Sequence, residues 1–233
     1  FLDGISYSKE KEIWNQGIKY WADFLRAEKV KGISKKRKIY FDSILRKAKH
    51  GLINGDYGLL LRSLPKKEHW RFFEHFQDEC LFLDIECSSV DKKGFMTIIT
   101  LYDGNDAMTM VQGANLDYCL LKKILSRFKM IVTYNGSVFD WNFLKKRCKI
   151  DFDVFHFDLR FSCARLGMKG GLKAVEKQLG IKRKSKIVSD LGSGQPYQLW
   201  RMFLCSKDRY YLNILIEYNL EDTINLQAIA KYA

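Results

Sequence analysis

The chain has 233 residues, of which 47% are hydrophobic and 29% charged, a balance that excludes an intrinsically disordered protein. Lys and Arg number 40 against 27 Asp and Glu, so the net charge is +13 and the pI about 9.4. This excess favours a polyanion as partner, and nucleic acid is the commonest one. The alternative is that the charge only keeps the protein in solution.

The six cysteines include no C-x-x-C pair, which argues against a zinc site or a disulfide framework. Buried, reduced thiols in a cytoplasmic protein are the better interpretation. No apolar stretch approaches the roughly 18 residues of a membrane span, and no secretory signal is recognisable. We therefore expect a cytoplasmic protein with no membrane partner.

The first 79 residues carry helical signals and no convincing strand. Apolar residues recur at helical spacing over residues 13–25, and the Asn54-Gly55 pair indicates a break. Pro65 suits the first turn of a helix that runs to about residue 73. We expect a helical N-terminal extension over residues 1–79.

The character of the sequence changes at Cys80. Residues 80–87 form an apolar run with the length of a strand, and residues 95–102 and 107–111 are rich in strand-forming types. The short connections between these three segments favour antiparallel hairpins.

Beyond residue 115, helix and strand signals alternate. The expected elements, in order, are a helix over 116–128, a strand over 130–134, a helix over 138–148, a strand over 154–159, and helices over 172–179, 197–205 and 208–230. Three antiparallel strands followed by this alternation predict an α/β domain over residues 80–233, with a mixed sheet flanked by helices.

Asp84 and Glu86 lie two residues apart in the first expected strand, so both side chains point to one face. Two like charges on a mostly buried strand repel one another and lose hydration. A divalent cation relieves both penalties, because hard cations prefer carboxylate oxygens. The alternative is a strand end at which both acids simply meet solvent.

Two further acids fall on later elements. Asp140 follows the Asn135-Gly136 turn and begins a helix, where a carboxylate is also favoured by the helix dipole alone. Asp222 lies in the apolar stripe of the last helix, between Tyr218 and Leu226. Acids are almost never buried unpaired, so either a cation or a salt bridge must compensate Asp222.

In this order, the motifs resemble those of the DEDD exonuclease superfamily, which has a ribonuclease-H-like fold. Phe82-Leu-Asp84-Ile-Glu86 is similar to its Asp-x-Glu motif, and Asn135-Gly-Ser-Val-Phe-Asp140 to the second motif. Tyr218-Asn-Leu-Glu-Asp222 resembles the third in its Tyr-x-x-x-Asp form, called DEDDy. More narrowly, the YprB-like family is resembled by the segment Gly171–Ile181 followed by Leu199-Trp200 and Tyr218-Asn219. The resemblance covers about residues 80–230.

The resemblance implies a 3′→5′ exonuclease that acts on single-stranded DNA or RNA with two divalent cations, Mg²⁺ or Mn²⁺. Asp84 would bridge the ions, Glu86, Asp140 and Asp222 would complete their ligands, and Tyr218 would orient the attacking water by hydrogen bonding. Asp158 would be either an extra ligand or the cap of the following helix.

Nucleic-acid binding requires positive charges for the phosphates. The basic loop supplies Lys182, Arg183, Lys184 and Lys186, and the second motif supplies Asn135. Two alternatives stay open within a nucleic-acid function: a non-catalytic binding module of a larger protein, and an endonuclease that uses the same metal site. A third is a scaffold unrelated to nucleic acid, whose acids pair with Lys and Arg.

Overall fold

The computed structural model describes the chain except for residues 1, 89–93, 147, 151–152 and 193. It divides into two compact units, Phe1–Pro65 and Lys66–Ala233. Among the described helices, none is both long and apolar enough to cross a membrane. All six cysteines are unpaired; Cys80 and Cys163 are buried, whereas Cys119 and Cys205 are exposed.

The first unit is helical. It contains α1 (Tyr7–Trp14), α2 (Trp21–Arg26), α3 (Lys35–Asn54) and α4 (Gly58–Ser63). Its core is made of Ile13, Phe24, Val30, Phe41 and Leu45. The expected break at Asn54-Gly55 is the end of α3, where Gly55 adopts a φ of 74° that a residue without a side chain takes up easily.

The second unit is built on a five-stranded mixed sheet of order β3-β2-β1-β4-β5. Its strands are β1 (Cys80–Cys87), β2 (Met96–Tyr102), β3 (Ala107–Val111), β4 (Met130–Thr133) and β5 (Phe155–Asp158). The first three pair antiparallel, while β4 runs parallel to both β1 and β5. This confirms the expected α/β class with a mixed sheet and flanking helices.

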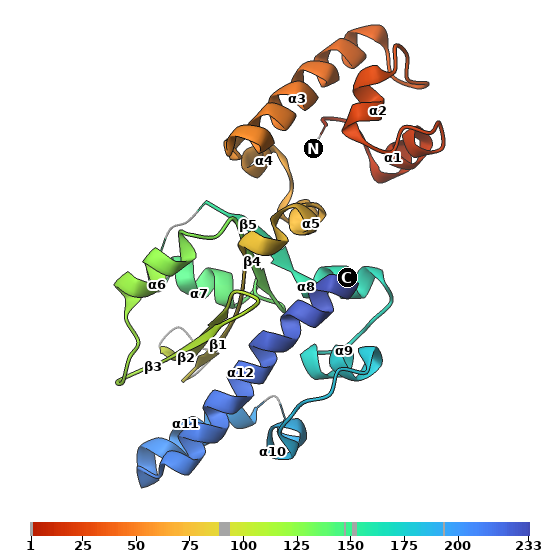
Figure 1. The fold of residues 1–233 in the computed structure, drawn as a ribbon. Coiled ribbons are helices and arrows are strands. Elements are labelled where there is room, and N and C mark those ends of the chain that lie inside the picture. Colours follow the sequence, from red (N-terminus) through yellow and green to blue (C-terminus); the bar gives the residue numbers. More distant parts are fainter. Residues whose placement is uncertain (1, 89–93, 147, 151–152, 193) are drawn as a thin grey trace. The chain divides into compact units, whose positions relative to one another are not determined.

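Helices cover both faces of the sheet (Figure 1). On one face, α6 (Tyr118–Leu125) and α7 (Asp140–Lys146) pack against alternate β1 residues Leu81, Leu83 and Ile85. On the other face, α11 (Gln195–Ser206) and the long α12 (Arg209–Tyr232) pack against β2 and β3. Because strand side chains alternate, Asp84 and Glu86 point to the α12 face.

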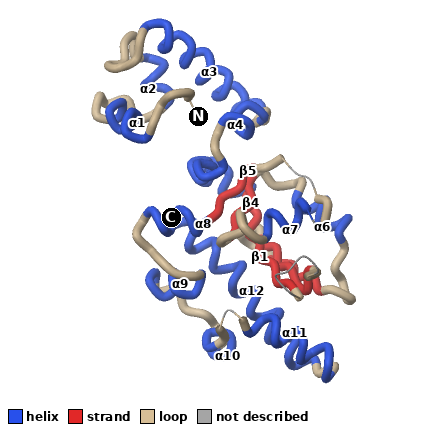
Figure 2. Tube along the Cα trace, turned by 180° about the vertical axis from the view of Figure 1, so that it is seen from behind, coloured by secondary structure: helices blue, strands red, loops and turns tan. Residues whose placement is uncertain are grey.

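Three shorter helices complete this unit: α8 (Leu159–Arg165), α9 (Leu172–Leu179) and α10 (Lys186–Asp190). All three contact α12, and α9 and α10 lie beside it in Figure 2. They therefore bring the basic segment around residue 183 to the same side as Asp222.

Residues 66–79 belong to the sheet unit, although we expected them in the N-terminal extension. They form η1 (Lys66–Phe72), α5 (Phe73–Phe76) and η2 (Gln77–Glu79). The rings of Phe72 and Phe76 lie 4.9 and 5.2 Å from that of Phe155 on the edge strand β5. This aromatic packing covers the strand edge and joins the segment to the sheet.

Candidate metal centre

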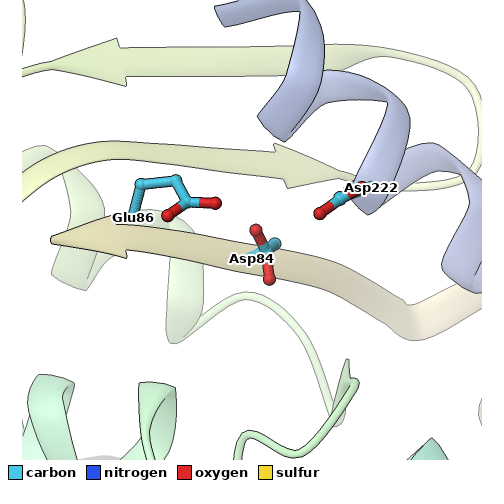
Figure 3. A group of neighbouring side chains, drawn as sticks. All are labelled: Asp84, Glu86 and Asp222. Carbon is cyan, nitrogen blue, oxygen red and sulfur yellow. The ribbon is translucent and has the colours of Figure 1, made fainter. Parts of the chain in front are cut away.

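Three carboxylates from two elements converge on the α12 face of the sheet. Asp84 and Glu86 come from β1 and Asp222 from α12, and one oxygen of each lies within 4.8 Å of the others (Figure 3). Asp84 and Glu86 are partly buried, and Asp222 is 6% exposed. The alternation of β1 and the stripe of α12 predicted these positions; their convergence is a product of the fold.

The group is electrostatically strained without a counter-charge. The pKa of Asp84 lies well above its ordinary value because of burial first, and then because of the charges of Asp140, Glu86 and Asp222. Burial, Asp222 and Asp140 raise the pKa of Glu86 to about 8. Among the described residues, no basic side chain forms an ion pair with Asp84, Glu86 or Asp140.

Asp222 differs, because it has a basic partner. Nη2 of Arg183 lies 2.5 Å from its Oδ1, in an ion pair that lacks the alignment of a hydrogen bond. Burial still raises the pKa of Asp222 to about 6, although Arg183 opposes the rise. Of the two sequence-based alternatives for this residue, the salt bridge is therefore present, and it neutralises one acid of the group.

Asp140 is tied to β1 from the start of α7. Its Oδ1 accepts a hydrogen bond of 3.1 Å from the backbone N–H of Ile85, the residue between Asp84 and Glu86. It is 4% exposed, and burial raises its pKa to about 7, against the effect of its backbone hydrogen bonds. Asp140 thus stands beside the three-acid group without belonging to it.

The Asn135-Gly136 turn delivers Asp140 to this position. Asn135 has a φ of 63°, and a Cβ on Gly136 would clash with the side chain of Thr133. The Asn135 side chain is engaged within the protein, since its Oδ1 accepts a 2.6 Å hydrogen bond from Nη1 of Arg160. The predicted nucleic-acid contact of Asn135 would have to compete with this bond.

Asp158 supports the same turn. Its Oδ1 accepts from the backbone N–H groups of Asn135 (2.8 Å) and Arg160 (3.1 Å), and its Oδ2 accepts from that of Ser137 (2.9 Å). It is the N-cap of α8, as the capping alternative expected. The structure does not bring Asp158 into the three-acid group.

Tyr218 lies one turn before Asp222 and is buried. Burial, and then the charges of Asp222, Glu86 and Asp84, raise the pKa of its phenol above the ordinary value. The ammonium of Lys173 and the guanidinium of Arg183 lie 5.0 and 5.6 Å from the centre of its ring. A phenol in this setting stays protonated at neutral pH and can only donate or accept hydrogen bonds.

Asn219 is a site residue that sequence reasoning missed. Its Nδ2 donates a 2.6 Å hydrogen bond to Oδ2 of Asp84, and its buried Oδ1 has no hydrogen-bond partner in the described part of the chain. The available signal was a polar amide beside Tyr218, about one turn before Asp222. Only the fold shows that it reaches β1.

The predicted basic residues divide into two groups. Lys182, Lys184 and Lys186 are exposed and line a cavity of about 540 Å³. Arg183 lines it too, but its side chain is 4% exposed and contacts the carboxylates of Glu176 and Asp222. The lysines are open to solvent, whereas Arg183 is engaged within the protein.

Comparison with known proteins extends these observations. A family model described as the RNase_H superfamily matches residues 81–233. The family B DNA polymerase from the hyperthermophilic archaeon Pyrobaculum calidifontis has a similar structure, with a TM-score of 0.54 and 19% identity over 66% of this chain. The match spans only 24% of the polymerase, and at this identity it shows the fold alone. No curated protein matched the chain.

Proposed function

Because the chain belongs to the RNase H superfamily, we propose that it is a metal-dependent nuclease that hydrolyses nucleic-acid phosphodiester bonds. More narrowly, we propose a DEDDy-type 3′→5′ exonuclease that acts on single-stranded DNA or RNA. The observation that carries the proposal is the convergence of Asp84, Glu86 and Asp222, whose oxygens lie within 4.8 Å of one another.

The residues of this group suit divalent cations. All the donors are oxygens, which Mg²⁺ and Mn²⁺ prefer. Burial first, and then the charges of the neighbouring carboxylates, raise the pKa values of Asp84 and Glu86, and a bound cation would offset that repulsion. Asp84, Glu86 and Asp222 would hold two cations, with Asp140 as a further ligand beside them. When bound, such ions activate water and stabilise a leaving oxygen.

The protein's own groups would position the reactants. Asn219 holds Asp84 by one oxygen, which fixes the orientation of that carboxylate. Tyr218 remains neutral and orients the attacking water, or the phosphate, through its hydroxyl group. Asp158 acts indirectly, because it holds the turn that places Asp140.

The substrate would be gripped through its phosphates. Lys182, Lys184 and Lys186 line the cavity that Arg183 also borders, and Arg183 touches Asp222. A nucleic-acid strand bound in this cavity would therefore pass next to Asp84, Glu86 and Asp222. The net charge of +13 would favour its approach from solution. Action in the cytoplasm stays a prediction.

One observation favours a second candidate, a non-catalytic nucleic-acid-binding module. The ion pair between Arg183 and Asp222 gives one acid a partner within the protein, as expected of a site that has lost its metals. Against it, Asp84, Glu86 and Asp140 have no such partners among the described residues. An endonuclease with the same site would differ only in where it cuts.

A digestion assay tests the proposal and its alternatives together. Single-stranded DNA and RNA, labelled at the 5′ end, are incubated with Mg²⁺ or Mn²⁺ and with wild-type protein, Asp84→Ala or Asp106→Asn. Asp106 is an exposed acid near the β2–β3 turn and serves as the matched control. We expect a ladder of shortened products from the wild type and the control, and none from Asp84→Ala.

Two other results would decide against an exonuclease. Immediate internal products would indicate an endonuclease. Salt-sensitive binding without cleavage under either metal would indicate the binding module.

A further inference from the structure

A buried arginine lies between the three-acid group and a fourth carboxylate. The Arg183 side chain is 4% exposed and contacts Asp222 on one side and Glu176 on the other. Its Nη1 has no hydrogen-bond partner among the described residues. Among the described residues, its ion pairs are with these two carboxylates, and the ring of Tyr218 lies 5.6 Å from the guanidinium.

Glu176 anchors this arginine. Its two carboxylate oxygens accept hydrogen bonds of 2.9 Å from Nε and Nη2 of Arg183, a paired geometry that fixes the plane of the guanidinium. Asn225 of α12 donates a further hydrogen bond of 2.8 Å to Glu176. Glu176 is itself 3% exposed, so the anchor is a built feature of the interior.

The contact with Asp222 is of another kind. It is close, at 2.5 Å between Nη2 and Oδ1, but Oδ1 receives no aligned hydrogen bond from described residues. Arginine keeps its charge at any pH at which the protein is folded. A permanent positive charge therefore stands beside one carboxylate that would hold a cation.

Resting on the proposed function, we propose that Arg183 is a positioning residue that sets the affinity of the site for divalent cations. It turns Asp222 by Oδ1 and leaves Oδ2 for the cation, and its charge weakens cation binding. Glu176 restrains Arg183, so that the arginine does not satisfy Asp222 completely. Together, Arg183 and Glu176 hold the Asp222 carboxylate in position while keeping the cation affinity low enough for the cations to dissociate.

If the contacts of Arg183 with Glu176 and Asp222 had only a structural role, a different result would be expected. If the three residues only hold α9 and α12 together, removal of either Arg183 or Glu176 loosens the site and lowers cation affinity. If charge at Asp222 sets the affinity, the two substitutions act in opposite directions. Loss of the positive charge of Arg183 strengthens cation binding, and loss of the negative charge of Glu176, which restrains Arg183, weakens cation binding.

Calorimetric titration with MnCl₂, in the absence of nucleic acid and near pH 8, distinguishes the two. The variants are Arg183→Met, Glu176→Gln and the matched control Arg201→Met, which removes an exposed arginine of α11. We expect Arg183→Met to bind Mn²⁺ at least about tenfold more tightly than wild type, and Glu176→Gln at least about tenfold more weakly. Arg201→Met should stay within about twofold.

Arg183→Lys keeps the test decisive if the methionine variant fails to fold. Lysine retains the charge without the paired hydrogen bonds, so we expect its Mn²⁺ affinity within about threefold of wild type. Weaker binding by both Arg183→Met and Glu176→Gln, or a large loss in Arg183→Lys, would overturn the inference and leave a structural salt bridge. Absence of Mn²⁺ binding by the wild type would instead overturn the proposed function itself.

Discussion

Replacement of Glu86 by glutamine should stabilise the metal-free protein at pH 8, although it removes a ligand of the proposed cations. The pKa of Glu86 is raised from an ordinary 4.5 to about 8 by burial and by the charges of Asp222 and Asp140. This difference corresponds to about 5 kcal/mol of unfavourable interaction with the ionised form. Because the neighbouring acids share their protons and can relax, we expect about 2–4 kcal/mol.

The pH dependence follows from where the proton is held. Below about pH 4.5, Glu86 is protonated in both the folded and the unfolded chain and contributes nothing. Between pH 4.5 and about 8, the unfolded chain releases this proton and the folded chain retains it, so the free energy of unfolding falls as pH rises. The glutamine side chain of the variant carries no ionisable proton, so the substitution removes this loss.

Urea unfolding in EDTA at pH 5 and pH 8 measures the effect. We expect Glu86→Gln to be about 2–4 kcal/mol more stable than wild type at pH 8, and to differ by less than about 1 kcal/mol at pH 5. Glu217→Gln, which replaces an exposed glutamate of α12, is the matched control and should change little at either pH. Equal destabilisation by Glu86→Gln at both pH values would refute the electrostatic reasoning.

Three further substitutions separate chemistry, folding and metal binding. Tyr218→Phe should slow single-turnover digestion about 10²-fold while the urea midpoint stays near that of wild type; unchanged turnover would remove Tyr218 from the reaction. Asp158→Ala should destabilise the protein by about 2–4 kcal/mol in urea, because three backbone N–H groups lose their acceptor, and a neutral result would contradict that role. Asn219→Leu should lower the Mn²⁺ affinity measured by calorimetry about 10-fold, because Asp84 loses the hydrogen bond that orients it. An unchanged affinity would contradict this role of Asn219.

Much of the sheet unit was predictable because its signals are local. The β1 strand and the helix at 172–179 follow from residue type, period and length, and their bounds agree with the structure. Residues 66–79 group with the sheet unit and not with the expected N-terminal extension, because the aromatic packing of Phe72 and Phe76 on Phe155 joins segments about 80 residues apart in the chain. No local pattern contains that contact.

In the site, too, the local features were predictable from the sequence and the long-range contacts were not. Asp84 and Glu86 could be paired from strand alternation, and Asp222 stood out as an acid in an apolar stripe. The bond from Asn219 to Asp84 spans 135 residues, and the contact of Arg183 with Asp222 likewise depends on how α9 packs on α12. Such contacts arise from tertiary packing, so the sequence alone singled out the acids but not the bond of Asn219 to Asp84 or the pairing of Arg183 with Asp222.

Crystals soaked in MnCl₂ and measured near the manganese absorption edge would test the metal centre most directly. We expect anomalous density for manganese within bonding distance of oxygens from Asp84, Glu86 and Asp222. Anomalous density that lies elsewhere, or none at a saturating concentration, would contradict a metal centre at this convergence of β1 and α12.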